Sequence, residues 1–202
     1  MRRIITLMFL LILTNFAFCQ IDAELSRYVD SLATADQKWR GLMRQVENGK
    51  IDTISRVIVI KNINLTDSLN FLQLKNIYKK YGFLGYDKVG KESSHNFWLL
   101  IQHADNYPAF QDSVLTKMKI EADKGNASFA EYAYLIDRVK VNTGQLQIYG
   151  TQMTLNSIKT SYVTKPTIDP EKLNERRKQA GLSPIEEYIK MMNQRYYGTL
   201  KK

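Results

Sequence analysis

The sequence predicts a mainly α protein: a single compact multi-helix domain with a small β-hairpin or irregular β arm near residues 145–163, preceded by a cleaved signal peptide. Apolar residues recur at helical spacing through most of the chain. Helix start signals fall where that periodicity begins, as at Asp169-Pro170 and Ser183-Pro184. No internal repeat or low-complexity tract interrupts the pattern. Agreement between periodicity and capping favours one helical domain.

Residues 1–19 have the features of a secretory signal peptide. Arg2-Arg3 precedes an apolar run from Ile4 to Phe18, and small residues occupy the positions that signal peptidase inspects before Gln20. We expect an exported mature chain, either periplasmic or secreted. Lipoprotein anchoring through Cys19 is the alternative, which the large Phe18 before the cysteine disfavours. The run is too short for a membrane span, so we expect no transmembrane segment after cleavage.

The mature chain is long enough for one domain with its own core. It keeps 27 of the 29 Lys and Arg residues against 20 Asp and Glu, a net charge of +7 that is dispersed along the chain. Dispersed charge is typical of a solvated surface, so we expect no nucleic-acid partner. Cleavage also removes the only cysteine, which excludes disulfides and thiolate metal sites. We expect a monomer with an amphipathic helical region at 20–66 and a helical domain with the β arm at 67–202.

Residues 22–48 predict one long amphipathic helix that Gly49 ends. Its apolar positions step alternately by three and four, which fits either a coiled-coil dimer or a long helix packed on its own domain. Tyr, Ala and Trp within the seam favour the second. The seam consists of Leu25, Tyr28, Leu32, Ala35, Trp39, Leu42 and Val46.

The segment Thr53–Leu65 is ambiguous between helix and strand. Val57–Ile60 has only β-branched residues, whereas its surroundings have helical spacing, and we favour a helix. Thr66 or Asp67 would cap a further helix that ends at Tyr81-Gly82. Its inward residues would be Leu69, Leu72, Ile77 and Tyr78.

Three glycines predict a loop over Gly82–Gly90, which leads to a strongly apolar helix over Ser94–Asp105. Gln102 and His103 at its end are candidates for buried polar groups. Each would need partners, because an unpaired buried polar group costs about 1–3 kcal/mol. The core stripe of this helix is Phe97, Leu100, Ile101 and Ala104, widened by Trp98 and Leu99.

Two more helices are expected before the β arm, one beginning at Pro108 and one at the capping box of Ser128 and Glu131. The second carries Asp137 on an otherwise apolar face. A carboxylate in that position needs a cation or several donors. Arg138 points away from its neighbour on a helix, so it cannot fill that role alone.

Five segments together resemble the bacterial domain-of-unknown-function family 6624, over roughly residues 75–189. They are Tyr86–Gly90, Trp98–Asp105, Ala133–Arg138, Gln147–Gln152, and Glu175–Arg177 with Gly181-Leu182. The resemblance implies no particular activity, since the family has no assigned reaction. It implies that eight polar residues stand at motif positions: Gln102, His103, Asp137, Arg138, Tyr149, Thr151, Gln152 and Arg177.

His103 and Asp105 could be a base with its orienting partner, or two metal ligands. Residues two apart on a helix point about 200° apart, so both could reach one ion only if the helix ends at His103. His95 lies about 80° round the helix from His103, which does not form a histidine pair for a metal. The sequence lacks the HExxH, phosphate-loop and GxSxG motifs. We therefore predict no metal and no cofactor.

Two functions fit these residues. The favoured one is a non-enzymatic binding or structural domain of the cell envelope, with an unknown small ligand or an envelope protein as its partner. The alternative is a hydrolase-like enzyme with His103 and Asp137 as catalytic candidates and with Arg138 or Arg177 to stabilise negative charge. The candidate ligand-binding residues are Gln102, Asp105, Tyr149, Thr151, Gln152 and Arg177. The same polar groups could instead only pin the β arm to the helices.

Overall fold

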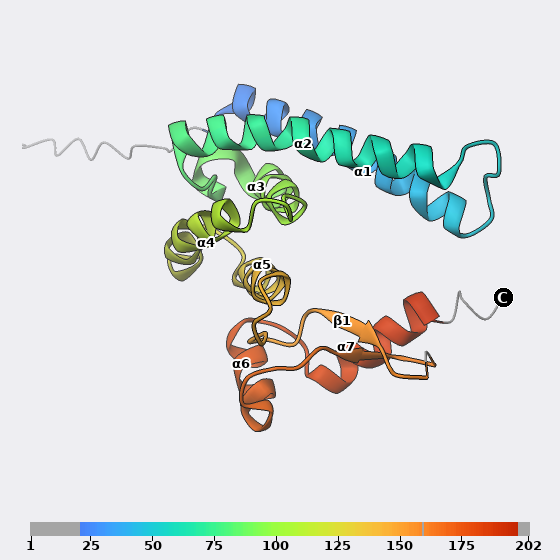
Figure 1. Ribbon diagram of the computed structural model, residues 1–202. Coiled ribbons are helices and arrows are strands. Elements are labelled where there is room, and N and C mark those ends of the chain that lie inside the picture. Colours follow the sequence, from blue (N-terminus) through green and yellow to red (C-terminus); the bar gives the residue numbers. More distant parts are fainter. Residues whose placement is uncertain (1–20, 159, 198–202) are drawn as a thin grey trace, which may run out of the picture.

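The structure is a computed structural model that describes residues 21–158 and 160–197 (Figure 1). The expected signal peptide, including Cys19, lies outside this range. The predicted mainly α class with a small β arm is confirmed. The helices are α1 (Ala23–Glu47), α2 (Arg56–Tyr81), α3 (Tyr86–Gln102), α4 (Pro108–Asp123), α5 (Phe129–Asn142), α6 (Leu173–Gln179) and α7 (Ile185–Met192). The strands β1 (Met153–Leu155) and β2 (Tyr162–Thr164), a 3-10 turn at Pro170–Lys172 and a π-helical turn at Asn193–Tyr197 complete the described chain.

α1 and α2 form a long antiparallel hairpin (Figure 1). The predicted single helix over residues 22–48 is confirmed, with Asp22 as its N-cap. The predicted seam is only partly right: Leu32 packs partly buried against the core, but Tyr28 and Ala35 are exposed. The buried positions are Leu25, Val29, Ala33 and Asp36. This stripe steps by four, four and three residues, as a straight helix packed on α2 and α3 requires.

α2 corrects two predictions. The helix favoured for 53–65 is confirmed from Arg56 onwards, but it continues through the predicted start at Thr66 or Asp67, so no cap exists there. Packing overrides the strand propensity of Val57–Ile60, since Val59 is fully buried. Leu69 and Leu72 were expected to face inwards but are more than half exposed. The inner face consists of Val59, Asn70, Phe71, Leu74 and Ile77.

α3 begins earlier than predicted. The expected loop over Gly82–Gly90 is wrong from Tyr86 onwards, where a first helical turn starts. Gly90 has a φ of 78° and kinks the helix between this turn and the apolar segment. The helix ends at Gln102, and His103 is its C-cap. The predicted core stripe is confirmed: Phe97, Leu100, Ile101 and Ala104 are all buried.

The main hydrophobic core lies among α1 to α5 and is continuous from Leu25 to Val139. A second, small cluster of Leu173, Ile185 and Tyr188 lies in the C-terminal part. There β1 and β2 pair antiparallel, with Thr154 opposite Val163. Within the described residues, no helix is long and apolar enough to cross a membrane.

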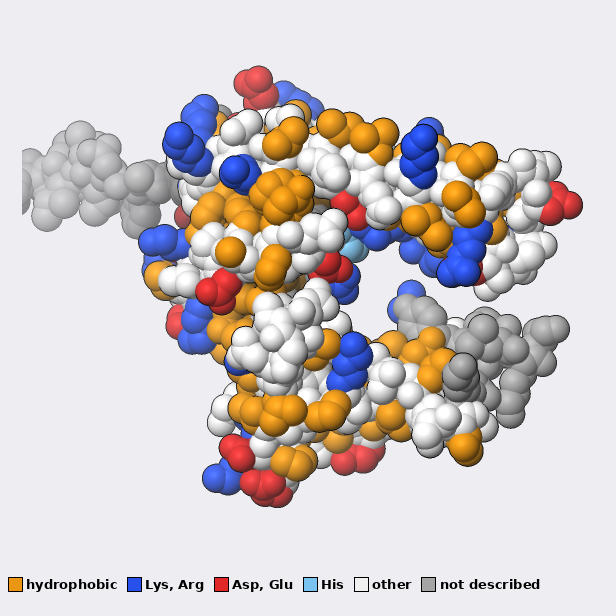
Figure 2. All heavy atoms as spheres, viewed as in Figure 1, with side chains coloured by type: hydrophobic (Ala, Val, Ile, Leu, Met, Phe, Trp, Pro, Cys, Tyr) orange, Lys and Arg blue, Asp and Glu red, His pale blue; other side chains and the backbone are white. Residues whose placement is uncertain are grey.

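The α1–α2 hairpin and the C-terminal part form two arms on either side of α3 to α5 (Figure 1). The space-filling view shows the molecule hollowed between these arms, with basic, acidic and histidine side chains gathered at the inner end (Figure 2). We call this concave surface the hollow.

Candidate functional site

His103 pairs with Asp36, a residue that the sequence analysis did not single out. The imidazole Nδ1 lies 3.0 Å from both carboxylate oxygens of Asp36. The Asp36 side chain is only 1% exposed and that of His103 12%. An ionised carboxylate can only accept hydrogen bonds, so Nδ1 carries the proton towards Asp36 and Nε2 is on the far side of the ring. The pair therefore fixes the orientation of the ring.

A chain of charges extends from this pair across the hairpin. Arg40 donates from Nε to Asp36, at 3.1 Å, and from Nη2 to Asp67 on α2, at 2.6 Å. Burial by itself raises the pKa of the Asp36 carboxyl, but the hydrogen bond and charge of His103, with the charge of Arg40, lower the pKa below its ordinary value. Burial raises the pKa of Asp67, and Arg40 only partly offsets this effect. The network ties α1, α2 and α3 together.

Asp105 and Arg138 form a second, more exposed pair beyond the end of α3. Arg138 donates from Nε and Nη2 to the two carboxylate oxygens, at 2.7 and 2.5 Å. Asn142, one turn further along α5, donates to the same carboxylate at 2.9 Å. Asp105 therefore does not orient His103, as one hypothesis required; Asp36 does. Arg138 is 28% exposed, so this fork is accessible from solvent.

Asp137, the neighbour of Arg138 on α5, points away from this fork and is fully buried. Its carboxylate accepts hydrogen bonds from the backbone N–H groups of Ile148, Tyr149 and Thr151, at 2.7 to 3.1 Å. It also accepts one from the Thr151 hydroxyl at 3.0 Å. The loop before β1 thus supplies the several donors that a buried carboxylate needs. Asp137 holds this loop on α5.

Arg177 is the largest fully buried side chain among the described residues. Its guanidinium donates to the carbonyl oxygens of Ser183 and Tyr149, both at 2.6 Å, and lies 4.9 Å from the ring centroid of Tyr188. Burial lowers the pKa of this guanidinium, although nearby tyrosines and carboxylates oppose the shift. Arg177 therefore links α6 to the same loop. Its two hydrogen bonds go to backbone oxygens of the chain itself.

Gln152 and Gln147 complete the loop. The backbone N–H of Gln152 donates to the side-chain oxygen of Gln147, and the Gln152 amide donates to the Thr151 hydroxyl. Gln147 is fully buried and donates to three oxygens, those of Gln152, Thr164 and Lys165. The Tyr149 phenol is half-buried, and burial raises its pKa. Of the candidate ligand-binding residues, those at 149–152 thus belong to the attachment of the β arm.

Gln102 is partly buried beside His103, and its backbone oxygen accepts a long hydrogen bond of 3.4 Å from Gln111. α3 ends at Gln102, which meets the geometric condition for His103 and Asp105 to approach one ion. In the range that the structure describes, however, no three His, Cys, Asp or Glu side chains are grouped so that they could hold a metal.

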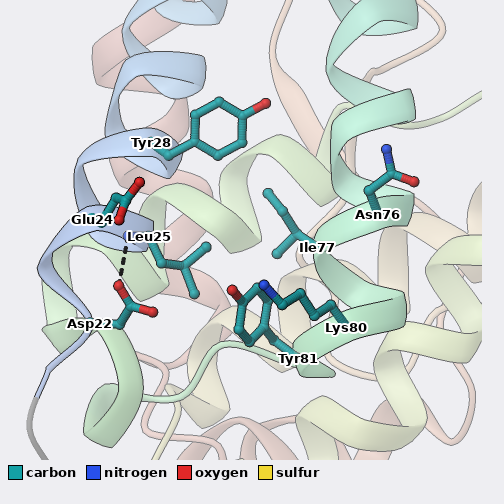
Figure 3. A pocket seen from close by; sticks show the side chains of 8 residues that line it. All are labelled: Asp22, Glu24, Leu25, Tyr28, Asn76, Ile77, Lys80 and Tyr81. Atoms are coloured by element: carbon teal, nitrogen blue, oxygen red, sulfur yellow. Dashed lines mark hydrogen bonds between the residues drawn. The ribbon is translucent and has the colours of Figure 1, made fainter.

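A second concavity lies at the other end of the hairpin, between the start of α1 and the end of α2 (Figure 3). It is an open pocket of about 340 Å³. Figure 3 shows Leu25, Ile77 and Lys80 reaching into it from the two helices. None of the sequence-predicted site residues lines it; the lining residues are Asp22, Glu24, Leu25, Tyr28, Asn76, Ile77, Lys80 and Tyr81.

The comparison with protein families decides the identity. The model of a family of unknown function, DUF6624, matches residues 23–201. The chain belongs to the DUF6624 family. The resemblance predicted from its five segments is thereby confirmed. No curated protein and no solved structure matches the chain significantly.

The DUF6624 segments predicted from the sequence meet at two places. Ala133–Arg138, Gln147–Gln152 and Glu175–Arg177 meet around the buried Asp137 and Arg177, whereas Trp98–Asp105 ends beside Asp36 and Arg138. His103 and Asp137 share no hydrogen-bond partner within the described residues. A pocket that combines the two stays a prediction.

Sequence reasoning missed Asp36, Arg40 and Asp67. One signal for Asp36 was available, because it extends the stripe of Leu25, Val29 and Ala33 at helical spacing. A carboxylate that ends an apolar stripe predicts a buried partner in the same way as Asp137 does. The same spacing holds for Asp67, which lies four and seven residues before the buried Phe71 and Leu74, but the sequence does not name its partner Arg40.

Proposed function

We propose that this DUF6624 chain is an exported, non-enzymatic binding domain of the cell envelope, and that a polar chain such as a peptide or a glycan binds in its hollow. One observation carries the proposal. Three side chains, of His103, Arg40 and Arg138, each donate hydrogen bonds to a carboxylate. Each also has one nitrogen that makes no hydrogen bond to the described residues. These nitrogens are His103 Nε2 and the Nη1 atoms of the two arginines.

The carboxylates hold these groups in fixed orientations before any ligand arrives. Asp36 orients His103 and Arg40, and Asp105 holds Arg138 through a two-pronged contact. A side chain that is already ordered loses little conformational entropy on binding. Hydrogen-bonding groups that are fixed and partly exposed favour a ligand site.

The charge balance favours a ligand with amide or hydroxyl groups. Three carboxylates, of Asp36, Asp67 and Asp105, accompany the two arginines, so the cluster has no surplus of positive charge. A strongly anionic ligand would gain little from such a cluster. Groups that both donate and accept hydrogen bonds fit the remaining nitrogens together with the partly exposed Asp105 carboxylate.

The contacts of Asp137 support the non-enzymatic role. As a second catalytic group, Asp137 would have to exchange protons with a bound substrate. It is fully buried, and all of its described hydrogen bonds go to residues 148–151. Export is supported by the basic, apolar and small-residue segments of residues 1–19, and the periplasm and the exterior are both compatible with them.

NMR titration of ¹⁵N-labelled protein, residues 20–202, tests the proposal with three probes: N-acetylglycinamide, N-acetylglucosamine and inorganic phosphate. We expect the amide or the sugar to shift resonances of residues 36–40, 102–105 and 138–142, and phosphate to shift them less. Arg138→Gln should weaken this response at least about threefold, because it removes a charged donor. Arg56→Gln, an exposed arginine paired with Glu47, is the matched control. Resonance shifts that are scattered over the surface would contradict a site in the hollow. So would shifts that are as large in Arg138→Gln as in the parent chain.

A second candidate is a hydrolase that uses His103 as a general base. The buried Asp36 on Nδ1 favours it, since a carboxylate that fixes the ring leaves Nε2 to take a proton from water. Hydrolysis of p-nitrophenyl acetate separates the two candidates. Turnover that His103→Gln and Asp36→Asn both abolish, while Arg56→Gln keeps it, would favour the enzyme.

A further inference from the structure

The outward face of α2 carries an apolar stripe that nothing in the described chain covers. Ile58, Leu65, Leu69 and Leu72 follow one another at intervals of seven, four and three residues and are 50% to 55% exposed. They lie opposite the buried face of the helix. Six of the fourteen large hydrophobic residues that are exposed in the described chain lie on this one helix. Exposed apolar side chains that are gathered in this way mark an interaction surface.

Basic side chains accompany the stripe. α2 contains Arg56 and four lysines, and its only acidic residue, Asp67, is bound to Arg40. Lys61, Lys75 and Lys79 are exposed on the same side of the helix as the leucines. Figure 2 shows the hydrophobic side chains in a row along α2, with basic side chains beside them and towards both ends. Near the two ends of α2, Glu47 pairs with Arg56, and Asp22 and Glu24 line the pocket beside Lys80.

This charge argues against a second copy of the chain as the partner. An antiparallel pair of α2 helices centred on Ser68 would bring Lys61 of each copy close to Lys75 of the other. A parallel pair would place each lysine near its own counterpart. Like charges at such positions destabilise a helix pair. An anionic lipid surface instead attracts the lysines and accepts the apolar stripe at its headgroup boundary.

We propose that the outward face of α2 lies on an anionic lipid surface, with Ile58, Leu65, Leu69 and Leu72 inserted between headgroups and with Lys61, Lys75 and Lys79 beside the phosphates. α2 packs on α1 and α3 through its other face, so the helix lies along the surface and the hollow stays open to solvent. This binding is independent of the ligand proposed for the hollow.

Vesicle flotation tests the proposal with residues 20–202, because the apolar residues 4–18 would bind lipid by themselves. The probes are vesicles of phosphatidylcholine alone and of phosphatidylcholine mixed with phosphatidylglycerol. We expect binding to the mixed vesicles only, with release at high salt. Two triple variants, Leu65→Ser/Leu69→Ser/Leu72→Ser and Lys61→Glu/Lys75→Glu/Lys79→Glu, should each reduce the partition coefficient at least about tenfold.

The matched control changes exposed hydrophobic residues elsewhere, Ile120→Ser/Leu146→Ser/Ile168→Ser, and should bind as the parent chain does. All substituted side chains are exposed, and an unchanged thermal midpoint checks that each variant folds. Absence of binding, equal binding to neutral vesicles, or binding that survives both α2 variants would overturn the proposal. So would light scattering that finds a dimer in the parent chain and a monomer in the leucine variant, since the face would then join two copies.

Discussion

Asp137 Oδ2 accepts two hydrogen bonds from Thr151, one from its backbone N–H at 2.9 Å and one from its hydroxyl at 3.0 Å. This contact joins α5 to a loop fourteen residues further along the chain. Asp137, which the sequence suggested as a possible catalytic base, therefore holds the β arm on α5.

The Thr151 hydroxyl should contribute to stability through Asp137. Thr151→Val removes the hydroxyl and keeps the shape, so we expect a loss of about 1–2 kcal/mol in the free energy of unfolding. In an Asp137→Asn background the same change should cost less, because its partner is altered. Urea unfolding of the four proteins measures this coupling. Thr116→Val, an exposed threonine bonded within its own helix, should have little effect; additive losses would argue against the contact.

Arg177→Lys should destabilise the protein although it keeps the charge. A lysine cannot donate to Ser183 and Tyr149 in the geometry of the guanidinium, so we expect a loss of about 2 kcal/mol. Urea unfolding checks this value, with the exposed Arg44→Lys as the control. A neutral Arg177→Lys would mean that charge alone is needed at this site.

Asp36 should make the stability depend on pH in acid. Its pKa is lower in the folded protein than its ordinary value, so the ionised form is stabilised above that value. This contribution is lost as the pH falls below about 4. Asp36→Asn should therefore be less stable at neutral pH and should lose stability less steeply in acid. Asp67 has a raised pKa, so its own contribution to stability increases as the pH falls, and Asp67→Asn should lose stability more steeply in acid than the parent chain does. Unfolding midpoints in urea across the acid range measure both variants.

His103→Gln should lower the thermal midpoint only modestly. Glutamine can still donate to Asp36, and Arg40 and Gln37 also bind that carboxylate. We expect a loss of about 1 kcal/mol, equivalent to a fall of about 2–4 °C for a domain of this size. Differential scanning calorimetry at neutral pH measures the midpoint. A raised midpoint would show that the fold does not need His103, as is common at functional sites.

The helices could be predicted wherever local signals act. Ser128 caps α5, Pro108 begins α4, and the apolar stripe of α3 lies in the core. The phase of α2 could not be predicted, because Leu69 and Phe71 are both apolar and only packing decides which one is buried. The same holds for the candidate site. A carboxylate on an apolar face predicted the several donors around Asp137, but the pairing of His103 with Asp36 links residues 67 apart and needs the fold.

The separation of roles between the neighbours Asp137 and Arg138 is the central claim, and urea unfolding of Asp137→Asn and Arg138→Gln tests it most directly. Asp137→Asn should cost on the order of 3 kcal/mol, since a buried carboxylate that accepts hydrogen bonds from four donors is removed. Arg138→Gln should cost less than about 1 kcal/mol, because its ion pair is partly exposed. Equal losses in the two variants would contradict this separation. Arg138 would then stabilise the fold as Asp137 does, and it would not be available to bind a ligand.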